Sequence, residues 1–282
     1  MSRLDLVDFV LVGPFKTGTS WMDVLLRSHP GVVLPSEVKE TFYFNDDSIH
    51  ARGEDWFKAL FATAEPLLKR GEVGPSYFHS ESALPRIRAA APDCRIICSL
   101  RDPAARLYSF YLHLLQRGEV RAGEAFLDVL DQRPFLLETA RYGHHTKRWQ
   151  QAFGRERVTV LQYEDLLHDK QGLVDSLCAG IGIDSIKVVD EMSGRVNESL
   201  MPSNQRVTRV AYSVARYLRR HGFHQLTNTA KNSGVRRLLF SSYSEKPRLS
   251  SDEQAVVHAR LRDDLDLLSE CVERRFDWQQ PE

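Results

Sequence analysis

The sequence has no excess of either charge, since 38 lysine and arginine residues stand against 38 aspartate and glutamate residues among its 282 residues. A protein that binds nucleic acid by bulk electrostatics carries a strongly basic surface, so we expect no nucleic-acid partner. Any anion-binding site in this chain must therefore be local.

Cysteine is scarce as well, and the four cysteines lack the spacing of a metal site. Cys94 and Cys98 have no second pair, and they lie in or beside an apolar run, so we expect them to pack in the core. The neighbours His144 and His145 have no cysteine or aspartate at ligand spacing. The sequence therefore predicts no metal.

Long hydrophobic runs are absent too. No stretch of about 18 apolar residues occurs, and no basic segment with a cleavable apolar stretch precedes the first predicted strand. We therefore expect a cytoplasmic protein with reduced thiols and no stable membrane anchor. The chain has no internal repeat, and its length allows one large α/β domain or at most two small ones. We predict a single domain over residues 1–282, with no oligomeric state indicated.

What the chain does contain is short apolar runs that alternate with segments of helical pattern. The runs 8–13, 94–100 and 157–162 are continuously apolar, which is typical of strands covered by helices on both faces. The pattern predicts an α/β, P-loop-like three-layer fold, with a central, mainly parallel sheet. We expect a shorter strand near 31–34, and loops and lids over a site in 185–250. Helices are expected at 19–28, 54–63, 82–91, 103–117, 124–131, 139–153, 164–180, 207–219 and 251–272.

The most informative segment is FVLVGPFKTGTSW, residues 9–21. A buried strand that runs through a small-residue loop into a helix presents backbone N–H groups, hydroxyls and an ammonium to one point. The alternative is an ordinary strand-to-helix turn. We interpret the segment as an anion site formed by Phe15, Lys16, Thr17, Gly18, Thr19, Ser20 and Trp21.

The glycine spacing of this loop allows a comparison with nucleotide-binding P-loops, which read G-x-x-x-x-G-K-[ST]. Gly13 and Gly18 have that spacing, but Thr19 stands where the lysine belongs, and the lysine comes earlier, at position 16. The hydroxyl expected to bind magnesium is therefore not adjacent to the lysine expected to bind phosphate, as it is in a P-loop. A P-loop small-molecule kinase becomes the alternative function.

A second cluster follows the predicted strand 94–100. Arg101 leaves the carboxyl end of that strand, Pro103 suits the first turn of a helix, and Ser109 lies about two turns further on. Carboxyl ends of parallel strands share one crevice, so we expect Arg101 to meet Lys16 there. Arginine supplies a planar fork for a phosphate, and serine a single hydroxyl. The alternative is that Arg101 forms a surface ion pair with its neighbouring aspartate.

These two motifs carry a resemblance. Lys16-x-Gly18-Thr19-x-Trp21 resembles the 5′-phosphosulfate loop of sulfotransferases that use 3′-phosphoadenosine 5′-phosphosulfate (PAPS), and LRDPxxRxxSxY resembles their 3′-phosphate motif. The order of features, over nearly the full length, resembles the carbohydrate type, namely heparan sulfate N- and 3-O-sulfotransferases and their bacterial relatives. Further matching segments are His29-Pro30-Gly31-Val32, Lys39-Glu40-Thr41-Phe42-Tyr43-Phe44, Glu72-x-x-Pro75-x-Tyr77-Phe78, Tyr142 to Trp149, Gln162-Tyr163-Glu164-Asp165-Leu166 and Arg275-Phe276-Asp277-Trp278.

The resemblance implies sulfuryl transfer from PAPS, without a metal, to a hydroxyl of a sugar or small natural product. The product of the donor is adenosine 3′,5′-bisphosphate (PAP). Lys16 would hold the 5′-phosphosulfate, while Arg101 and Ser109 would hold the 3′-phosphate. Lys246 and Arg248, in a partial counterpart of the family's C-terminal loop, would close over that phosphate.

The glutamate of the family's K-E-x-H-F-F segment is its catalytic base, and the matching residue is Glu40. A carboxylate among aromatic side chains loses solvent and gains a higher pKa, which suits proton transfer. Glu37 is the rival carboxylate. A nucleotide-binding module without activity is a third hypothesis, against which the intact Glu40 and Lys16 count. The acceptor contacts that we predict are Phe42, Tyr77, His79 and His113.

Three departures from the family pattern concern the acceptor site and the C-terminal loop. Val73 stands where heparan sulfate enzymes have a second lysine, so a cationic contact is missing or supplied elsewhere, and a glycosaminoglycan acceptor is disfavoured. The family's histidine position is Phe42 here. Pro247 replaces a glycine between Lys246 and Arg248.

Overall fold

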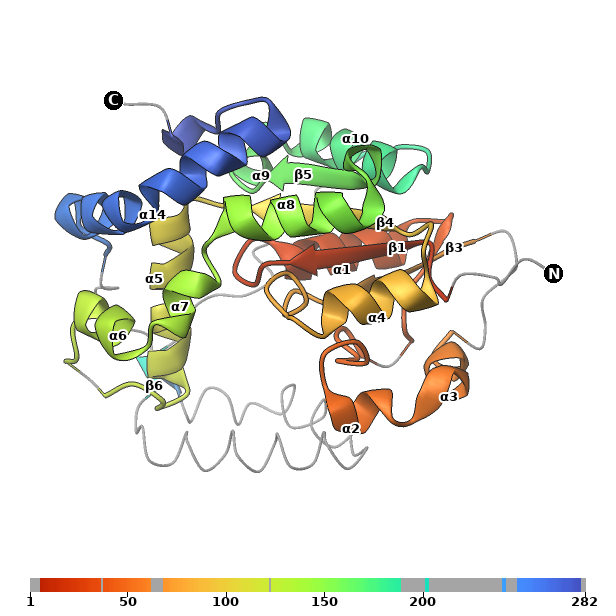
Figure 1. The fold of residues 1–282 in the computed structure, drawn as a ribbon, viewed down its shortest axis with the longest axis horizontal. Helices are drawn as coiled ribbons and strands as arrows, with labels where there is room; N and C mark the ends of the chain where they lie inside the picture. The colour runs from red at the N-terminus through yellow and green to blue at the C-terminus, as the bar shows by residue number, and fades with distance from the viewer. Residues whose placement is uncertain are drawn as a thin grey trace. The chain divides into compact units, whose positions relative to one another are not determined.

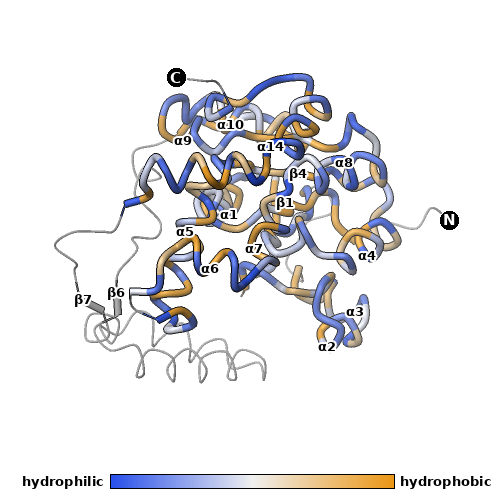
Figure 2. The backbone as a smooth tube through the Cα atoms, turned by 60° about the vertical axis from the view of Figure 1, so that its left-hand side comes forward, coloured by the Kyte–Doolittle hydropathy of each residue, from blue (hydrophilic) through white to orange (hydrophobic). Residues whose placement is uncertain are grey.

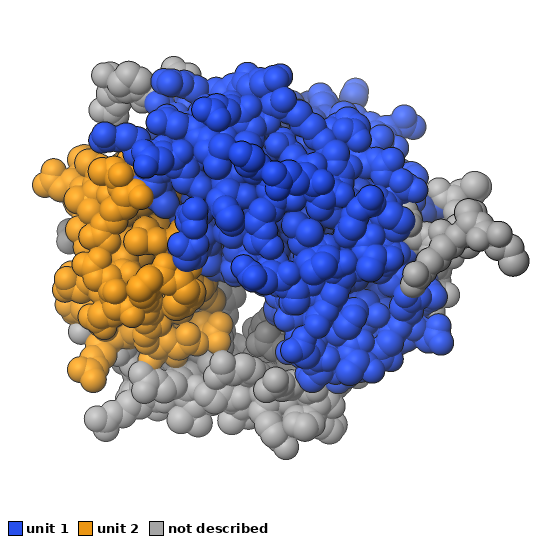
Figure 3. All heavy atoms as spheres, viewed as in Figure 1, with its two compact units in different colours: residues 1–102, 138–196, 261–282 blue, residues 103–137, 197–260 orange. Residues whose placement is uncertain are grey.

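The computed structural model divides the chain into two compact units, which Figure 3 shows in different colours. Unit 1 comprises residues 1–102, 138–196 and 261–282, and unit 2 comprises residues 103–137 and 197–260. The single domain expected over the whole chain stays a prediction. The structure describes residues 6–36, 38–61, 68–121, 123–188, 201–202, 240–241 and 248–279.

A five-stranded parallel sheet forms the centre of unit 1, with strand order β2-β3-β1-β4-β5. In the register of the central strand, Phe9 lies opposite Gly71 on one side and Arg95 on the other. The predicted α/β fold with a parallel sheet is therefore confirmed. The strands are β1 (Phe9–Gly13), β2 (Val32–Val33), β3 (Lys69–Val73), β4 (Arg95–Leu100) and β5 (Val158–Gln162).

Helices cover both faces of this sheet, which explains why the central strands β1 and β4 are almost entirely apolar. Phe9 and Leu11 of β1 pack in a buried cluster with α1 (Thr19–Ser28) and α10 (Lys170–Ile181). On the opposite face lie α4 (Ala83–Ala90) and α8 (Tyr142–Phe153), as Figure 1 shows. Along α14 (Ser251–Val272) the backbone alternates between hydrophobic and hydrophilic colours in Figure 2, and Val257, Leu261, Leu265 and Leu268 are buried, as expected of a helix with one apolar face.

The predicted elements differ from the observed ones in a few places. Strand β3 was not expected, and the helix expected at 164–180 is two helices, α9 (Asp165–His168) and α10. The break falls at Asp169, whose carboxylate accepts a hydrogen bond from the backbone N–H of Gly172 (3.0 Å) and caps α10. The helix expected at 207–219, and most of the stretch 185–250, lie outside the described residues.

The remaining elements complete the description. Cys94 and Cys98 are fully buried, as expected of packing residues. Among the described residues, no helix has the length and apolarity needed to cross a membrane. The other helices and strands are α2 (Asp47–His50), α3 (Gly53–Ala59), α5 (Pro103–Gln116), α6 (Phe126–Gln132), α7 (Phe135–Glu138), β6 (Met201–Pro202), β7 (Phe240–Ser241), α14 (Ser251–Val272) and the 3-10 turns Arg155–Arg157 and Asp277–Gln279.

The strand order places β1 between β3 and β4, so connections leave the sheet in opposite directions beside its carboxyl end. In open α/β sheets this point, outside the carboxyl ends of the strands, is where ligands bind. The loop that follows β1 lies there.

Candidate functional site

The loop between β1 and α1 depends on glycine at both ends. Gly13 has φ +101°, and a Cβ atom there would lie 2.5 Å from the carbonyl oxygen of Pro75. Gly18 has φ +78° and is the N-cap of α1, without a side-chain cap. The Gly13–Pro14 peptide bond is cis. An uncapped helix start at the carboxyl end of a central strand is a place for an anion.

Hydrogen bonds within the loop and from the carboxyl end of β4 anchor this loop. Thr17 donates a hydrogen bond from Oγ1 to the carbonyl of Pro14 (2.6 Å), and Ser99 donates from Oγ to the carbonyl of Thr17 (2.8 Å). Arg101 donates from Nη1 to the carbonyl of Lys16 (3.4 Å). The carboxyl end of β4 therefore holds the loop, and the expected proximity of Arg101 and Lys16 is present.

Lys16 supplies the loop's own cation. Its backbone has φ +71°, a left-handed conformation that is uncommon outside glycine and that clusters at functional sites. Burial lowers the pKa of the Lys16 ammonium, and the positive charges of Arg101 and Lys39 lower it further. Three cations thus act on one another around the loop, an arrangement that a bound anion would relieve.

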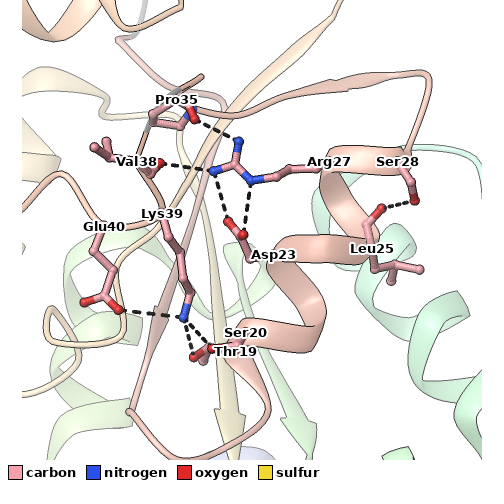
Figure 4. A network of polar contacts seen from close by, with 10 residues as sticks. All are labelled: Thr19, Ser20, Asp23, Leu25, Arg27, Ser28, Pro35, Val38, Lys39 and Glu40. Atoms are coloured by element: carbon pink, nitrogen blue, oxygen red, sulfur yellow. Dashed lines mark hydrogen bonds and ion pairs between the residues drawn. The ribbon is translucent and has the colours of Figure 1, made fainter. Parts of the chain in front are cut away.

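Lys39 is a residue that sequence reasoning did not assign to the site. Its ammonium donates to the Ser20 hydroxyl (3.0 Å) and the Thr19 hydroxyl (3.3 Å), and lies 3.7 Å from Oε1 of Glu40 (Figure 4). Its position beside the predicted base was the one signal in the sequence. The structure adds that Lys39 connects the anion loop with Glu40.

The segment that carries Lys39 and Glu40 is tied to α1 by Arg27 (Figure 4). The Arg27 guanidinium pairs with Asp23 one turn earlier (3.1 Å) and donates to the carbonyls of Pro35 (2.8 Å) and Val38 (3.1 Å). Helix α1 therefore carries the hydroxyls of Thr19 and Ser20 at its N-terminus and, through Arg27, holds the segment that faces them. The rival carboxylate, Glu37, lies outside the described residues.

Beneath Glu40 lies a buried polar cluster centred on Glu72 of β3. Its Oε1 accepts hydrogen bonds from the Thr41 N–H (3.0 Å), the Thr41 hydroxyl (2.5 Å) and the Tyr77 hydroxyl (2.9 Å). The pKa of Glu72 is raised to about 7, chiefly by burial and to a smaller extent by the charge of Glu40, whereas the hydrogen bonds from Thr41 and Tyr77 oppose the rise. Glu72 is fully buried, so it cannot contact an acceptor directly.

The residues predicted to line the acceptor site differ in exposure. Tyr77 is fully buried in the Glu72 cluster, so we assign it to that cluster rather than to the acceptor. Phe42 is 41% exposed and has φ +57°, a strained conformation that presents its ring to solvent beside Glu40. His79 packs edge-on against Phe15 of the loop, with 5.6 Å between ring centroids.

The other predicted residues lie in the core of unit 1, in unit 2 or outside the described residues. Trp21 is buried in the core cluster, with 6% of its surface exposed. Ser109 and His113 lie on α5, and Arg248 precedes α14 as an exposed residue, all three in unit 2. Lys246 lies outside the described residues. In the described part of the chain, no group of three or more histidine, cysteine or acidic residues could hold a metal ion.

Comparisons with known proteins concern the family and the fold of this chain. Residues 6–261 match the family described as the sulfotransferase domain. The solved structure of a sulfotransferase from Alicyclobacillus acidocaldarius superposes with a TM-score of 0.67 at 21% identity, covering 97% of this chain and 99% of that one. At that identity the likeness concerns the fold.

Two relatives are similar in sequence over about half of this chain or more. The human bifunctional heparan sulfate N-deacetylase/N-sulfotransferase 3 is 29% identical over 196 residues, which are 62% of this chain and 22% of the relative. The membrane-associated sulfotransferase kil1 of Dictyostelium discoideum is 30% identical over 161 residues, 55% of this chain and 33% of the relative. The chain thus spans a third or less of the length of these relatives.

Proposed function

Since this chain belongs to the sulfotransferase family, we propose that it moves a sulfuryl group from PAPS to the hydroxyl of a sugar or small natural product. The observation that carries the proposal is the convergence of Lys16, Lys39 and Arg101 on an uncapped helix start, with the carboxylate of Glu40 beside them. Such a site suits a polyanionic donor and an acceptor that must lose a proton.

The residues present fit the phosphosulfate end of PAPS. Lys16 and the backbone N–H groups of residues 17 to 20 would hold the 5′-phosphosulfate, and Arg101, anchored at the loop, would take the 3′-phosphate. Ser109 would add a hydroxyl to that phosphate. PAPS supplies the activated sulfuryl group, and the protein contributes positioning and charge stabilisation.

The proposed reaction is an in-line displacement. A bond forms between the acceptor oxygen and sulfur, and the bond between sulfur and the oxygen of the 5′-phosphate breaks, leaving PAP. Glu40 accepts the proton of the acceptor hydroxyl. Lys16 neutralises the charge that develops on the departing oxygen, which its partly buried position favours because screening by water is weaker there.

The acceptor class follows from the surroundings of Glu40. The exposed ring of Phe42 offers an apolar face of the kind on which sugar rings and small apolar molecules pack. Val73, at the position of the family's second lysine, is buried in the core with 1% exposed, so the carboxyl end of β3 offers an apolar side chain at the position where those enzymes have a cation. We therefore favour a weakly charged carbohydrate or natural product over a glycosaminoglycan.

A small-molecule kinase is the competing function, and nucleotide binding separates the two. Isothermal titration with PAP and with ATP–Mg²⁺ should show binding of PAP and much weaker binding of ATP–Mg²⁺. Release of PAP from PAPS should then be measured against a panel of sugar, phenol and lipid-headgroup hydroxyls, with and without EDTA. Turnover that withstands EDTA supports the proposal, whereas ATP–Mg²⁺ binding that exceeds PAP binding would favour the kinase.

A further inference from the structure

We propose that Lys39 is a further catalytic residue, whose ammonium binds the transferring sulfuryl group and takes the role that Mg²⁺ has in P-loop nucleotide enzymes. This inference rests on the proposed function, because it concerns the same donor. The family pattern has a lysine at the position of Val73, and this chain lacks that cation. We assign its role to Lys39.

The first argument is the identity of the hydroxyl that Lys39 contacts. With the glycine spacing of Gly13 and Gly18, Ser20 falls at the position whose hydroxyl binds Mg²⁺ in a P-loop. Here the Ser20 hydroxyl accepts a hydrogen bond from the Lys39 ammonium at 3.0 Å. A lysine from a different segment therefore occupies, on the same hydroxyl, the place of the metal ion.

The second argument is the location of the ammonium between the two halves of the reaction. It contacts Thr19 and Ser20 on the donor side and lies 3.7 Å from the carboxylate of Glu40 on the acceptor side. In an in-line transfer, the sulfuryl group passes between the departing oxygen and the attacking oxygen. A cation that touches both sides is placed to stabilise the peripheral oxygens of that group.

The third argument is the rigidity of the segment that presents Lys39. Arg27 holds the carbonyls of Pro35 and Val38 and is itself fixed by Asp23 (Figure 4). The side chains of Lys39 and Glu40 are each 27% exposed, so water screens their charges only in part. A catalytic cation benefits from both conditions, since it must be preorganised and poorly screened.

The test compares two nucleotides that differ by the sulfuryl group alone, in the absence of any acceptor. Dissociation constants of PAPS and PAP are measured by titration calorimetry for wild type, Lys39→Met, Lys39→Gln and Lys39→Arg. Loss of a charged hydrogen bond should weaken PAPS binding about tenfold or more in the two neutral variants, while PAP affinity stays within about twofold. Lys39→Arg should recover part of the loss. With two neutral variants, the comparison stands if one of them fails to fold.

Lys58→Met is the matched control, because Lys58 is also paired with a glutamate, Glu54 (3.2 Å), but on the solvent-facing side of helix α3, where the two side chains are 48% and 38% exposed. It should bind both nucleotides as wild type does. Equal weakening of PAPS and PAP in the Lys39 variants, or no weakening of either, would overturn the assignment while leaving the proposed function intact. A wild-type protein that binds neither nucleotide would overturn the proposed function, and this assignment with it.

Discussion

Arg101 donates a hydrogen bond to the backbone carbonyl of Lys16, and its guanidinium lies 4.7 Å from the centre of the Tyr163 ring. The residue thus connects the ends of three strands, since Lys16 follows β1, Arg101 follows β4 and Tyr163 follows β5. One side chain both shapes the anion loop and adds a cation to it. A substitution at Arg101 therefore tests the donor site at its centre.

Arg101→Ala should weaken PAP binding about ten- to a hundredfold, because a charge-assisted contact to the 3′-phosphate is lost. Adenosine 5′-phosphate, which has no 3′-phosphate, should bind nearly as it does to wild type. Calorimetric titration of both nucleotides measures the difference. Arg95→Ala, at the opposite end of β4, is the control and should change neither affinity. Equal losses for the two nucleotides would show that Arg101 acts on the loop rather than on the 3′-phosphate.

Much of the fold was predictable because its signals are local. The continuously apolar runs marked β1, β4 and β5, and the helices 19–28 and 251–272 have the expected bounds. Strand β3 was not predicted because its sequence, KRGEV, is mostly polar. One of the two buried residues after its glycine is Glu72. That residue is accommodated in the core because Thr41 and Tyr77, from other segments, donate hydrogen bonds to its Oε1, and because burial raises its pKa and so favours the neutral carboxyl.

The candidate site was predictable to the same extent. The positions of the loop, Lys16 and Arg101 could be predicted because each directly follows a predicted strand. The carboxyl ends of neighbouring parallel strands lie at the same edge of a sheet. The bonds from Lys39 to Thr19 and Ser20 could not be predicted in this way, since they join residues about twenty positions apart and Lys39 lies outside any helix or strand. The sequence matched Glu72 as part of a family motif, but its position in a buried cluster next to Glu40 could be recognised only in the folded structure.

Glu40→Gln should lower kcat by about 10²- to 10⁴-fold, because glutamine keeps the size and a hydrogen-bonding oxygen but does not take the acceptor's proton. PAP affinity should stay near the wild-type value, since the change concerns the acceptor side. The measurement is release of PAP from PAPS with an acceptor that the wild-type enzyme uses.

Two glutamates serve as comparisons for this variant. Glu54→Gln, on α3 and paired with Lys58, removes an exposed carboxylate and should leave kcat unchanged. Glu37→Gln addresses the rival carboxylate and should have a much smaller effect than Glu40→Gln. Loss of turnover in Glu37→Gln, together with an active Glu40→Gln, would assign the proton transfer to Glu37.

The last prediction concerns Glu72, whose pKa burial raises to about 7 from the ordinary value of 4.5. The folded protein therefore keeps this proton to a higher pH than the unfolded chain does. Between about pH 4.5 and pH 7 the folded state binds more protons, so the free energy of unfolding falls as pH rises. The stability is fully present below the unfolded pKa and is lost as pH passes the folded pKa, by an amount of order 3 kcal/mol.

Glu72→Gln removes this titration and leaves an amide oxygen that still accepts from Thr41 and Tyr77. Urea unfolding at about pH 5 and about pH 8 should show a smaller loss of stability in the variant than in wild type, by roughly 1–3 kcal/mol. Glu54→Gln, a change at an exposed carboxylate, should keep the wild-type difference. The same pH dependence in wild type and Glu72→Gln would mean that Glu72 is ionised throughout this range, with its three hydrogen bonds outweighing its burial.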